Sequence, residues 1–231
     1  NSVLDITILS TLSCNMECTY CFEQGVENAG NMKRETADVL CDWIIARLKE
    51  TNAPRLFITF FGGEPLVNKD IITYLAENLY NSTHAIGVTL ELALITNGLL
   101  LSEQLIDTLN IFGLEWIKVT LDGDQVTHDK MRPRKGGNGS YQEIMNKLIR
   151  IKGKVPIIIG SNYDETIQER LPYLYQDLKE NGFSSTDIDE VAFKPIQGFL
   201  EHETNSTHHI AAHTFSMTDL KIFNSLRTKY K

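Results

Sequence analysis

Residues 4 to 22 read LDITILSTLSCNMECTYCF. The first seven of these residues are rich in apolar and β-branched types and predict a strand, and Cys14, Cys18 and Cys21 follow it on one short loop. A cubic iron–sulfur cluster usually takes four cysteine thiolates, so three of them leave one iron open. An open iron is a place where a substrate or cofactor binds, and this loop therefore predicts a metal centre.

The three cysteines also allow a zinc knuckle or a disulfide. A structural zinc usually has four ligands, and residues 1–80 contain no histidine that would complete the set. A disulfide is disfavoured because closely spaced cysteines without a signal peptide indicate a reduced compartment. The remaining cysteine, Cys41, lies among apolar residues of a predicted helix, and we expect it in the core as a small hydrophobe.

Composition indicates a globular enzyme domain. The chain has 231 residues, 42% of them hydrophobic, which is enough for a substantial core. Its formal charge of −8 disfavours nonspecific binding of nucleic acid or of anionic membranes. We find neither an apolar stretch that would span a bilayer nor a signal peptide, and we expect a cytoplasmic protein.

Short β-rich runs alternate with longer helical patterns along the chain. Strands are predicted over residues 4–10, 56–61, 89–95, 116–121, 155–159 and 191–196. Helices are predicted over residues 34–50, 69–81, 102–112, 141–152, 166–181 and 218–229. Such alternation implies parallel strands with helical crossovers, and six units are too few for the usual eight-fold barrel. The predicted fold class is therefore α/β, a partial (β/α)6 TIM-like barrel with parallel strands.

Unusual residues follow the second and third predicted strands, where such a fold forms its site. Gly62 and Gly63 let the backbone approach a ligand closely, and the carboxylate of Glu64 is suited to an ammonium group. Taken alone, this motif is equally typical of a tight turn ended by proline. The run 96–98, Thr-Asn-Gly, is typical of a turn with a polar tip.

The fourth predicted strand ends in Thr120-Leu121-Asp122-Gly123 and is followed by His128, Asp129 and Arg132. An arginine here is suited to a ligand carboxylate, although such a basic run is also typical of a solvated loop. The glycine-rich run 136–140 lacks the lysine and hydroxyl that end a phosphate-binding loop. We expect a flexible lead-in to the next helix, with Ser140 as its cap.

Taken together, these motifs resemble the radical S-adenosylmethionine (SAM) superfamily. The resemblance rests on the cysteine spacing with Tyr20 before the last cysteine, on the Gly-Gly-Glu-Pro run, and on the Thr-Leu-Asp-Gly run with its downstream arginine. Within the superfamily, the chain is similar to the branch of anaerobic sulfatase-maturating enzymes and peptide maturases with a SPASM or twitch extension. The resemblance covers about residues 4 to 200.

The resemblance implies a cluster and a cofactor. Cys14, Cys18 and Cys21 would hold a [4Fe–4S] cluster, and SAM would bind its fourth iron. Tyr20 would lie near the adenine of the cofactor. The remaining residues implied as cofactor-binding are Gly62, Gly63 and Glu64 for the methionyl ammonium, Thr120 and Arg132 for the ribose and carboxylate, and Asn162 and Phe193 for the adenosine.

The resemblance also implies an activity. A low-potential electron, from a donor of the flavodoxin or ferredoxin type, would cleave SAM to a 5′-deoxyadenosyl radical that abstracts hydrogen from a peptide or protein substrate. The protein would supply positioning and exclusion of water. The alternatives are the same chemistry on a small molecule and a non-enzymatic zinc- or cluster-binding domain. No catalytic acid or base is assigned.

The domain expectation follows the same resemblance. Residues 1–200 are expected to form the core domain, and residues 201–231 a polar loop and a final helix that closes it. No cysteine follows Cys41 and the chain begins without methionine, so we expect a fragment that lacks the auxiliary-cluster extension. His209 and His213 could share a helical face, but a mobile polar loop is favoured there and no metal is assigned.

Overall fold

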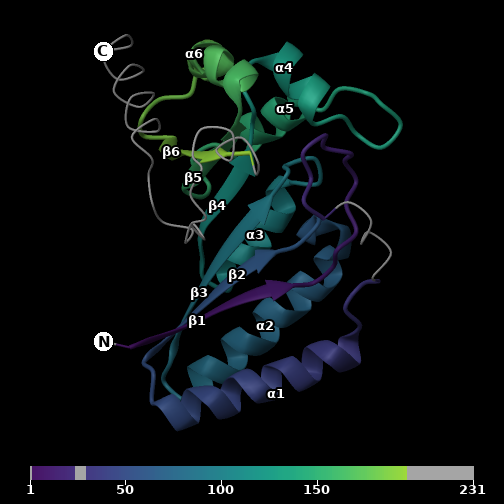
Figure 1. Cartoon of the computed structure of the whole chain (residues 1–231). Helices are drawn as coiled ribbons and strands as arrows, with labels where there is room; N and C mark the ends of the chain where they lie inside the picture. The colour runs from purple at the N-terminus through teal and green to yellow at the C-terminus, as the bar shows by residue number, and fades with distance from the viewer. Residues whose placement is uncertain (1, 24–29, 197–231) are drawn as a thin grey trace, which may run out of the picture.

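The fold is built on six parallel strands whose order in the sheet is their order in the chain (Figure 1). The computed structural model describes residues 2–23 and 30–196. The strands are β1 (Val3–Leu9), β2 (Arg55–Phe61), β3 (Thr89–Thr96), β4 (Leu114–Thr120), β5 (Ile157–Tyr163) and β6 (Ile188–Pro195). The helices are α1 (Arg34–Thr51), η1 (Pro65–Asn68), α2 (Lys69–Ala85), α3 (Glu103–Ile111), α4 (Gln125–Met131), α5 (Tyr141–Ile151) and α6 (Glu165–Glu180). The predicted parallel sheet with helical crossovers is thus confirmed.

The two faces of the sheet have different surroundings. On β2, Leu56, Ile58 and Phe60 are fully buried and belong to the main core, whereas the residues between them are only half-buried. Strand pairing continues this alternation across the sheet, because Ile58 pairs with Leu92 of β3. One face therefore packs against the helices, and we call the other the inner face.

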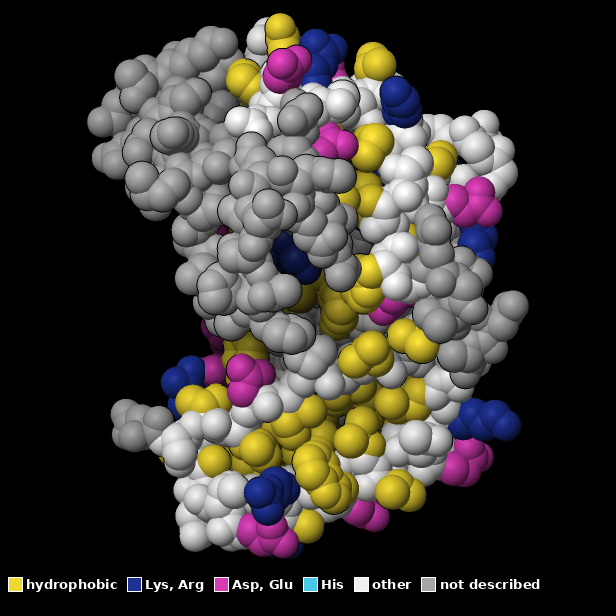
Figure 2. All heavy atoms as spheres, in the orientation of Figure 1, with side chains coloured by type: hydrophobic (Ala, Val, Ile, Leu, Met, Phe, Trp, Pro, Cys, Tyr) yellow, Lys and Arg dark blue, Asp and Glu magenta, His cyan; other side chains and the backbone are white. Residues whose placement is uncertain are grey.

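The inner face carries both apolar and charged side chains. The rings of Phe57 and Trp116 lie 6.2 Å apart on this face, and the small Ala93 of β3 separates their strands. Arg55, at the amino end of β2, forms a bidentate ion pair with Glu91 at 2.6 Å. Hydrophobic side chains also gather over the part of the surface that corresponds to β1 to β3 (Figure 2). The inner face is thus less completely buried than the face that packs against the helices.

The element pattern differs from the expectation at two places: the short helix η1 precedes α2, and a further helix lies between β4 and β5. The short helix α4 lies there in addition to α5 and was not predicted, because seven residues contain too few turns for a periodic pattern. The side chain of Asp124 caps its first turn by accepting a hydrogen bond from the Thr127 amide at 3.1 Å. The helix ends before Pro133, which cannot continue it.

Some predictions fall outside the described residues. These are the final helix over residues 218–229 and the histidines of the polar tail, His209 and His213. Within residues 2–23 and 30–196, no helix is long and apolar enough to cross a membrane. The core cysteine was predicted correctly, because Cys41 is 8% exposed and belongs to the main core on α1.

Candidate active site

The cysteine loop follows β1 and lies at the carboxyl end of the sheet. Cys14, Cys18 and Cys21 are not in disulfides and are each half-buried, and they line a common pocket of about 270 Å³. Burial raises the pKa of Cys14, and it raises the pKa of Cys18 to about 11. Burial favours the neutral thiol, and a bound metal reverses that preference because it binds the thiolate.

One side of the cysteine loop packs against the loop after β2. A Cβ atom on Gly62 would lie 2.3 Å from the carbonyl oxygen of Thr11, and one on Gly63 would lie 2.3 Å from that of Leu12. The Gly63 amide donates a hydrogen bond to Thr11 at 3.2 Å. The two glycines therefore let one loop approach the other. Sequence analysis had interpreted them instead as letting the backbone approach a ligand.

The other side of the cysteine loop pairs with the segment after α4. The amides of Glu17 and Thr19 donate to the carbonyl oxygens of Pro133 and Met131, at 2.8 and 2.9 Å. The basic run that was also compatible with a solvated loop therefore supports the three thiols. The cysteine loop is held between two segments that are distant in sequence.

Glu64 is wholly buried beneath the cysteine loop. Its carboxylate accepts hydrogen bonds from the Leu66 amide at 3.0 Å, the Thr96 hydroxyl at 2.7 Å and the Asn97 amide at 2.7 Å. Burial raises the pKa of Glu64, and these three donors oppose that shift. Glu64 thus ties the end of β2 to the end of β3.

Asn97 is a site residue that sequence analysis missed. Its side-chain amide lies 3.7 Å from the sulfur of Cys14 and donates to the Asn15 side chain at 2.7 Å. It was interpreted only as the tip of a turn, because a Thr-Asn-Gly run is common in turns. The signal that identifies it is its place directly after a parallel strand, at the same end as the cysteines.

A buried polar network joins the cysteine loop to β4 and β5. The hydroxyl of Tyr20 bonds to the carboxylate of Asp122, and it accepts hydrogen bonds from Arg132 at 2.6 Å and from Asn162 at 3.1 Å. Burial raises the pKa of Asp122, and the Arg132 guanidinium opposes the shift. Asp122 also accepts the Asn162 amide at 2.7 Å. The structure thus brings together Tyr20, Arg132 and Asn162, three residues predicted from sequence, around an aspartate that was not assigned.

Arg132 retains an unused donor within this network. It is 7% exposed, and its Nε atom has no hydrogen-bond partner among the described residues. A buried donor without a partner is costly, so such atoms are typical of sites that bind a further group. This observation agrees with an anionic ligand beside the cysteine loop.

His128 supports this network from below. Its Nδ1 atom accepts the Asp122 amide at 3.1 Å, so the proton of the neutral ring lies on Nε2, 2.9 Å from the Ser140 hydroxyl. That hydroxyl donates to the Arg132 carbonyl at 2.8 Å. Ser140 is the N-cap residue of α5 as expected, but its side chain makes no capping hydrogen bond. Asp129 instead accepts the amides of Ser140 and Tyr141.

Two further predicted residues occupy different faces. Thr120 ends β4 and is half-buried on the inner face, opposite Gly160 of β5. Phe193 pairs with Ser161 and packs with the cluster around Tyr163, on the side away from the inner face. The structure therefore places Thr120 beside the polar network and does not bring Phe193 to it.

The residues present fit a [4Fe–4S] cluster better than a single metal ion. Within the part of the chain that the structure describes, no three His, Cys, Asp or Glu side chains gather closely enough to ligate one ion. A cubic cluster binds each thiolate to a different iron, so its ligands are spread around a pocket. Three half-buried cysteines around one pocket, beside a buried cation, satisfy that requirement.

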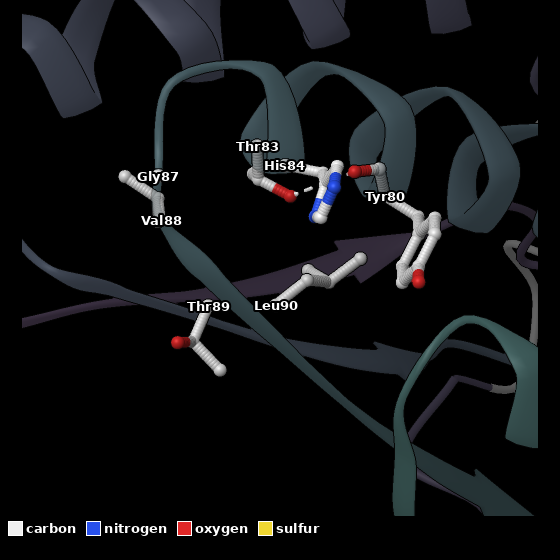
Figure 3. Close-up of a pocket in the computed structure, with 7 residues that line it drawn as sticks. All are labelled: Tyr80, Thr83, His84, Gly87, Val88, Thr89 and Leu90. Carbon is white, nitrogen blue, oxygen red and sulfur yellow. Dashed lines mark hydrogen bonds between the residues drawn. The ribbon is translucent and has the colours of Figure 1, made fainter.

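A second pocket lies at the opposite end of the sheet (Figure 3). It has a volume of about 360 Å³ and lies between the end of α2 and the start of β3. The His84 ring stacks on Tyr80, and the Thr83 hydroxyl donates back to Leu79 at 2.7 Å within its own helix. Because parallel barrels form their sites at the carboxyl ends of the strands, we assign the chemistry to the cysteine pocket.

Comparison with known proteins agrees with this geometry. The chain is 28% identical over 207 residues to a probable GTP 3′,8-cyclase of Archaeoglobus fulgidus, covering 87% of this chain and 64% of that protein. It is 24% identical to the sporulation killing factor maturation protein SkfB of Bacillus subtilis strain 168, over 71% of this chain and 36% of that protein. The chain thus spans less than two thirds of the length of these relatives.

The fold is shared with a solved structure. Native anSMEcpe with bound AdoMet and a peptide superposes with a TM-score of 0.75 at 18% identity, covering 99% of this chain and 60% of that chain. This likeness confirms the α/β partial barrel. The family model of the radical SAM superfamily matches residues 8–171, most of the chain and all of the elements that carry the cysteine pocket and the polar network. The chain therefore belongs to the radical SAM superfamily.

Proposed function

We propose that this chain is the catalytic core of an enzyme that modifies a peptide or protein by hydrogen abstraction. Radical SAM enzymes use a [4Fe–4S] cluster and SAM. The observation that carries the proposal is the pocket lined by three cysteines and held against a buried polar network with an unused arginine donor. When bound, the cluster and SAM supply reductive cleavage of the cofactor and abstraction of a substrate hydrogen.

The residues of this chain divide the work of binding. Cys14, Cys18 and Cys21 hold the cluster, and Asn97 lies where it can donate to the Cys14 sulfur. The Arg132 guanidinium offers its free Nε to the cofactor carboxylate. Burial of these groups excludes water, which strengthens each electrostatic contact.

Further cofactor contacts belong to the same proposal. Tyr20 and Asn162 are placed toward the adenosine, and Thr120 offers a hydroxyl to the ribose. The Gly-Gly-Glu loop forms the binding site for the methionyl ammonium together with backbone groups that Glu64 holds in place. Phe193 packs in the cluster around Tyr163, on the side away from the inner face, and we assign it no contact with the adenosine.

One relative and one solved structure support peptide modification. The relative is a maturation protein for a sporulation killing factor, and the solved structure holds a peptide as well as AdoMet. The proposal also includes a core domain over residues 1–200 and a C-terminal region that binds auxiliary clusters. The electron donor is proposed to be of the flavodoxin or ferredoxin type. A small-molecule substrate is the second candidate, because a GTP cyclase matches 87% of the chain.

The test is reductive cleavage of SAM by the full-length protein. The protein is reconstituted anaerobically with iron and sulfide, reduced with dithionite, and 5′-deoxyadenosine is quantified. Wild type and Cys41→Ala are expected to form it, since Cys41 lies in the core on α1. Cys18→Ala is expected to lose both the cluster absorbance and the product. A cluster-loaded wild type that forms no 5′-deoxyadenosine contradicts the proposal.

The same preparation separates the two substrate classes. Peptide modification predicts that 5′-deoxyadenosine formation rises when a peptide library is added, with a mass change in a peptide. The second candidate predicts that GTP raises product formation and is itself consumed.

A further inference from the structure

Lys118 is a charged residue of the inner face to which the mechanism assigns no role. It lies on β4 between the fully buried Ile117 and Val119, so its side chain projects to the opposite face of the sheet. Its neighbours in the sheet are Ile95 of β3 and Ile158 of β5. Lys118 is half-buried in this apolar setting.

The lysine side chain leans toward the carboxyl end of the sheet. A Cβ atom built on Gly160 would lie 2.7 Å from Lys118 Cε and 3.6 Å from the Thr120 hydroxyl oxygen. Gly160 pairs with Thr120, two residues beyond the partner of Lys118. The end of the lysine side chain therefore lies at the level of Thr120, next to the cofactor site.

No carboxylate of the described chain pairs with this lysine. Residues 2–23 and 30–196 offer Lys118 neither a hydrogen bond nor an ion pair within 4.0 Å. Glu190 acts on it only at longer range, and Lys194 adds a second positive charge. By contrast, the guanidinium of Arg55, which also lies on the inner face, is paired with the Glu91 carboxylate.

This arrangement is unfavourable unless an anion binds. Burial lowers the pKa of Lys118, because the ammonium has lost water without gaining a close counter-charge. An anion that binds here restores the lost interactions, and it does so beside the reacting end of the cofactor pocket. Arg132 is already available for the cofactor carboxylate.

We propose that Lys118 binds a carboxylate of the substrate peptide, next to the residue that is modified. The inference rests on the proposed function and narrows its substrate class to peptides with an acidic side chain or a C-terminal carboxylate near the modified position. Phe57 and Trp116 form an apolar floor one level further toward the amino ends of the strands. The peptide backbone thus enters from the carboxyl end of the sheet.

The test is selection of peptides from a randomised library by the full-length, cluster-loaded protein with SAM. Wild type is expected to enrich Asp or Glu at one fixed position, or the free C-terminus if that is the source of the carboxylate. An enriched peptide is then compared with its Asn, Gln or amidated counterpart. The acidic form is expected to bind about ten- to hundredfold more tightly, as for a charge-assisted hydrogen bond.

Three variants assign this preference to Lys118. Lys118→Gln is expected to remove it, and Lys118→Glu to reverse it in favour of neutral or basic peptides. Gly160→Ala is expected to weaken it, because the added methyl displaces the lysine Cε while its charge remains. Arg55→Gln, on the same face but ion-paired at the amino end, is the matched control and keeps the full preference.

Several results would overturn the inference. If Lys118→Gln keeps the acidic preference, another group binds the peptide carboxylate. If it weakens SAM binding tenfold in equilibrium dialysis, the lysine serves the cofactor. If Lys118→Gln and Glu190→Gln both lower the melting temperature to the same extent, the lysine serves the fold through Glu190.

One outcome concerns the proposed function itself. A protein that forms 5′-deoxyadenosine but enriches no peptide is not a peptide modifier, and the inference fails with the proposal. Enriched peptides without a Lys118-dependent acidic preference leave peptide modification standing and remove the inference alone.

Discussion

At the residue scale, Gly63 and Gly160 differ in what surrounds them. A Cβ on Gly63 would meet the backbone carbonyls of Leu12 and Ser13, whereas one on Gly160 would meet the mobile end of Lys118. Neither glycine has a positive φ, so alanine substitution at either position adds no backbone strain of that kind. A comparison of the two substitutions therefore measures the effect of steric overlap alone.

We expect Gly63→Ala to lower the free energy of unfolding by about 3 kcal/mol, because a rigid loop must shift. Gly160→Ala is expected to cost less than about 1 kcal/mol, because a side-chain end moves instead. Urea denaturation of both variants measures the difference. Equal losses would show that the cysteine loop is not clamped as tightly as its backbone contacts indicate.

His128 makes stability depend on pH. Burial lowers the pKa of His128 in the folded protein well below its ordinary value of 6.5. Between the folded and the unfolded pKa, the unfolded chain therefore binds a proton that the folded protein excludes. The stability contribution is complete above pH 6.5 and is lost as the pH falls below it, by up to about 1.4 kcal/mol per pH unit.

Urea unfolding of wild type and His128→Gln from pH 8 to pH 5 tests this dependence. The variant is expected to lose less stability on acidification. The slopes of the unfolding free energy against pH are expected to differ by up to the value for one bound proton. Glu64 and Asp122 have pKa values raised by burial and act with opposite sign, but they do so in both proteins and cancel in the difference. Parallel curves would mean that His128 is protonated in the folded state.

At the element scale, two helices are capped by aspartates in different settings. Asp129 caps α5 from across the loop that carries Arg132, at 2.7 and 2.8 Å to two amides. Asp164 caps α6 locally, accepting the Ile167 amide at 2.9 Å. The cap formed by Asp129 therefore also holds part of the site, whereas the cap formed by Asp164 stabilises only its own helix.

Asp129→Ala and Asp164→Ala are each expected to cost about 1–2 kcal/mol of stability. Only Asp129→Ala is expected to weaken SAM binding to the reconstituted protein, because it also releases the loop that positions Arg132. Equilibrium dialysis with labelled SAM distinguishes the two variants. Equal affinity in both would show that the loop is held by its other contacts.

The sequence predicted elements well where their pattern is long enough. All six strands and the helices of about nine residues or more within the described chain were found, because buried positions recur at fixed spacing. The end bounds differ by a few residues, as at β6, and α4 was missed.

Sequence analysis named single residues of the candidate site but not the contacts between them. The cysteines, the glycine pair and Arg132 are local motifs. The bond between Tyr20 and Asp122 joins residues 102 apart and that between Tyr20 and Arg132 joins residues 112 apart, and no local pattern encodes such pairs. Asn97 was missed because a Thr-Asn-Gly run that only forms a turn has the same local sequence as one whose asparagine lies beside the cysteines.

At the scale of the whole molecule, the sheet has two edges. Among the described residues, β1 and β6 each pair with one neighbour, whereas β2 to β5 are paired on both sides. The outward ends of the sheet therefore have fewer contacts to break when the structure opens.

We expect hydrogen exchange to follow this order. Amides of β3 should require nearly global unfolding to exchange, and those of β1 and β6 should exchange through smaller openings. Exchange followed by mass spectrometry measures the protection of each strand. Protection of β6 equal to that of β3 would mean that the edge is covered.

The clamped cysteine loop has a consequence for biosynthesis. Thr19 pairs with Met131, 112 residues later in the chain. At about 5 to 20 residues per second, a ribosome needs roughly 6 to 22 s to make the intervening segment. For that interval the nascent chain carries three thiols on a loop that lacks one of its two supports. We therefore expect iron insertion to follow translation of residues 131–133, which supply this support, and we expect the thiols to be most vulnerable to oxygen before then.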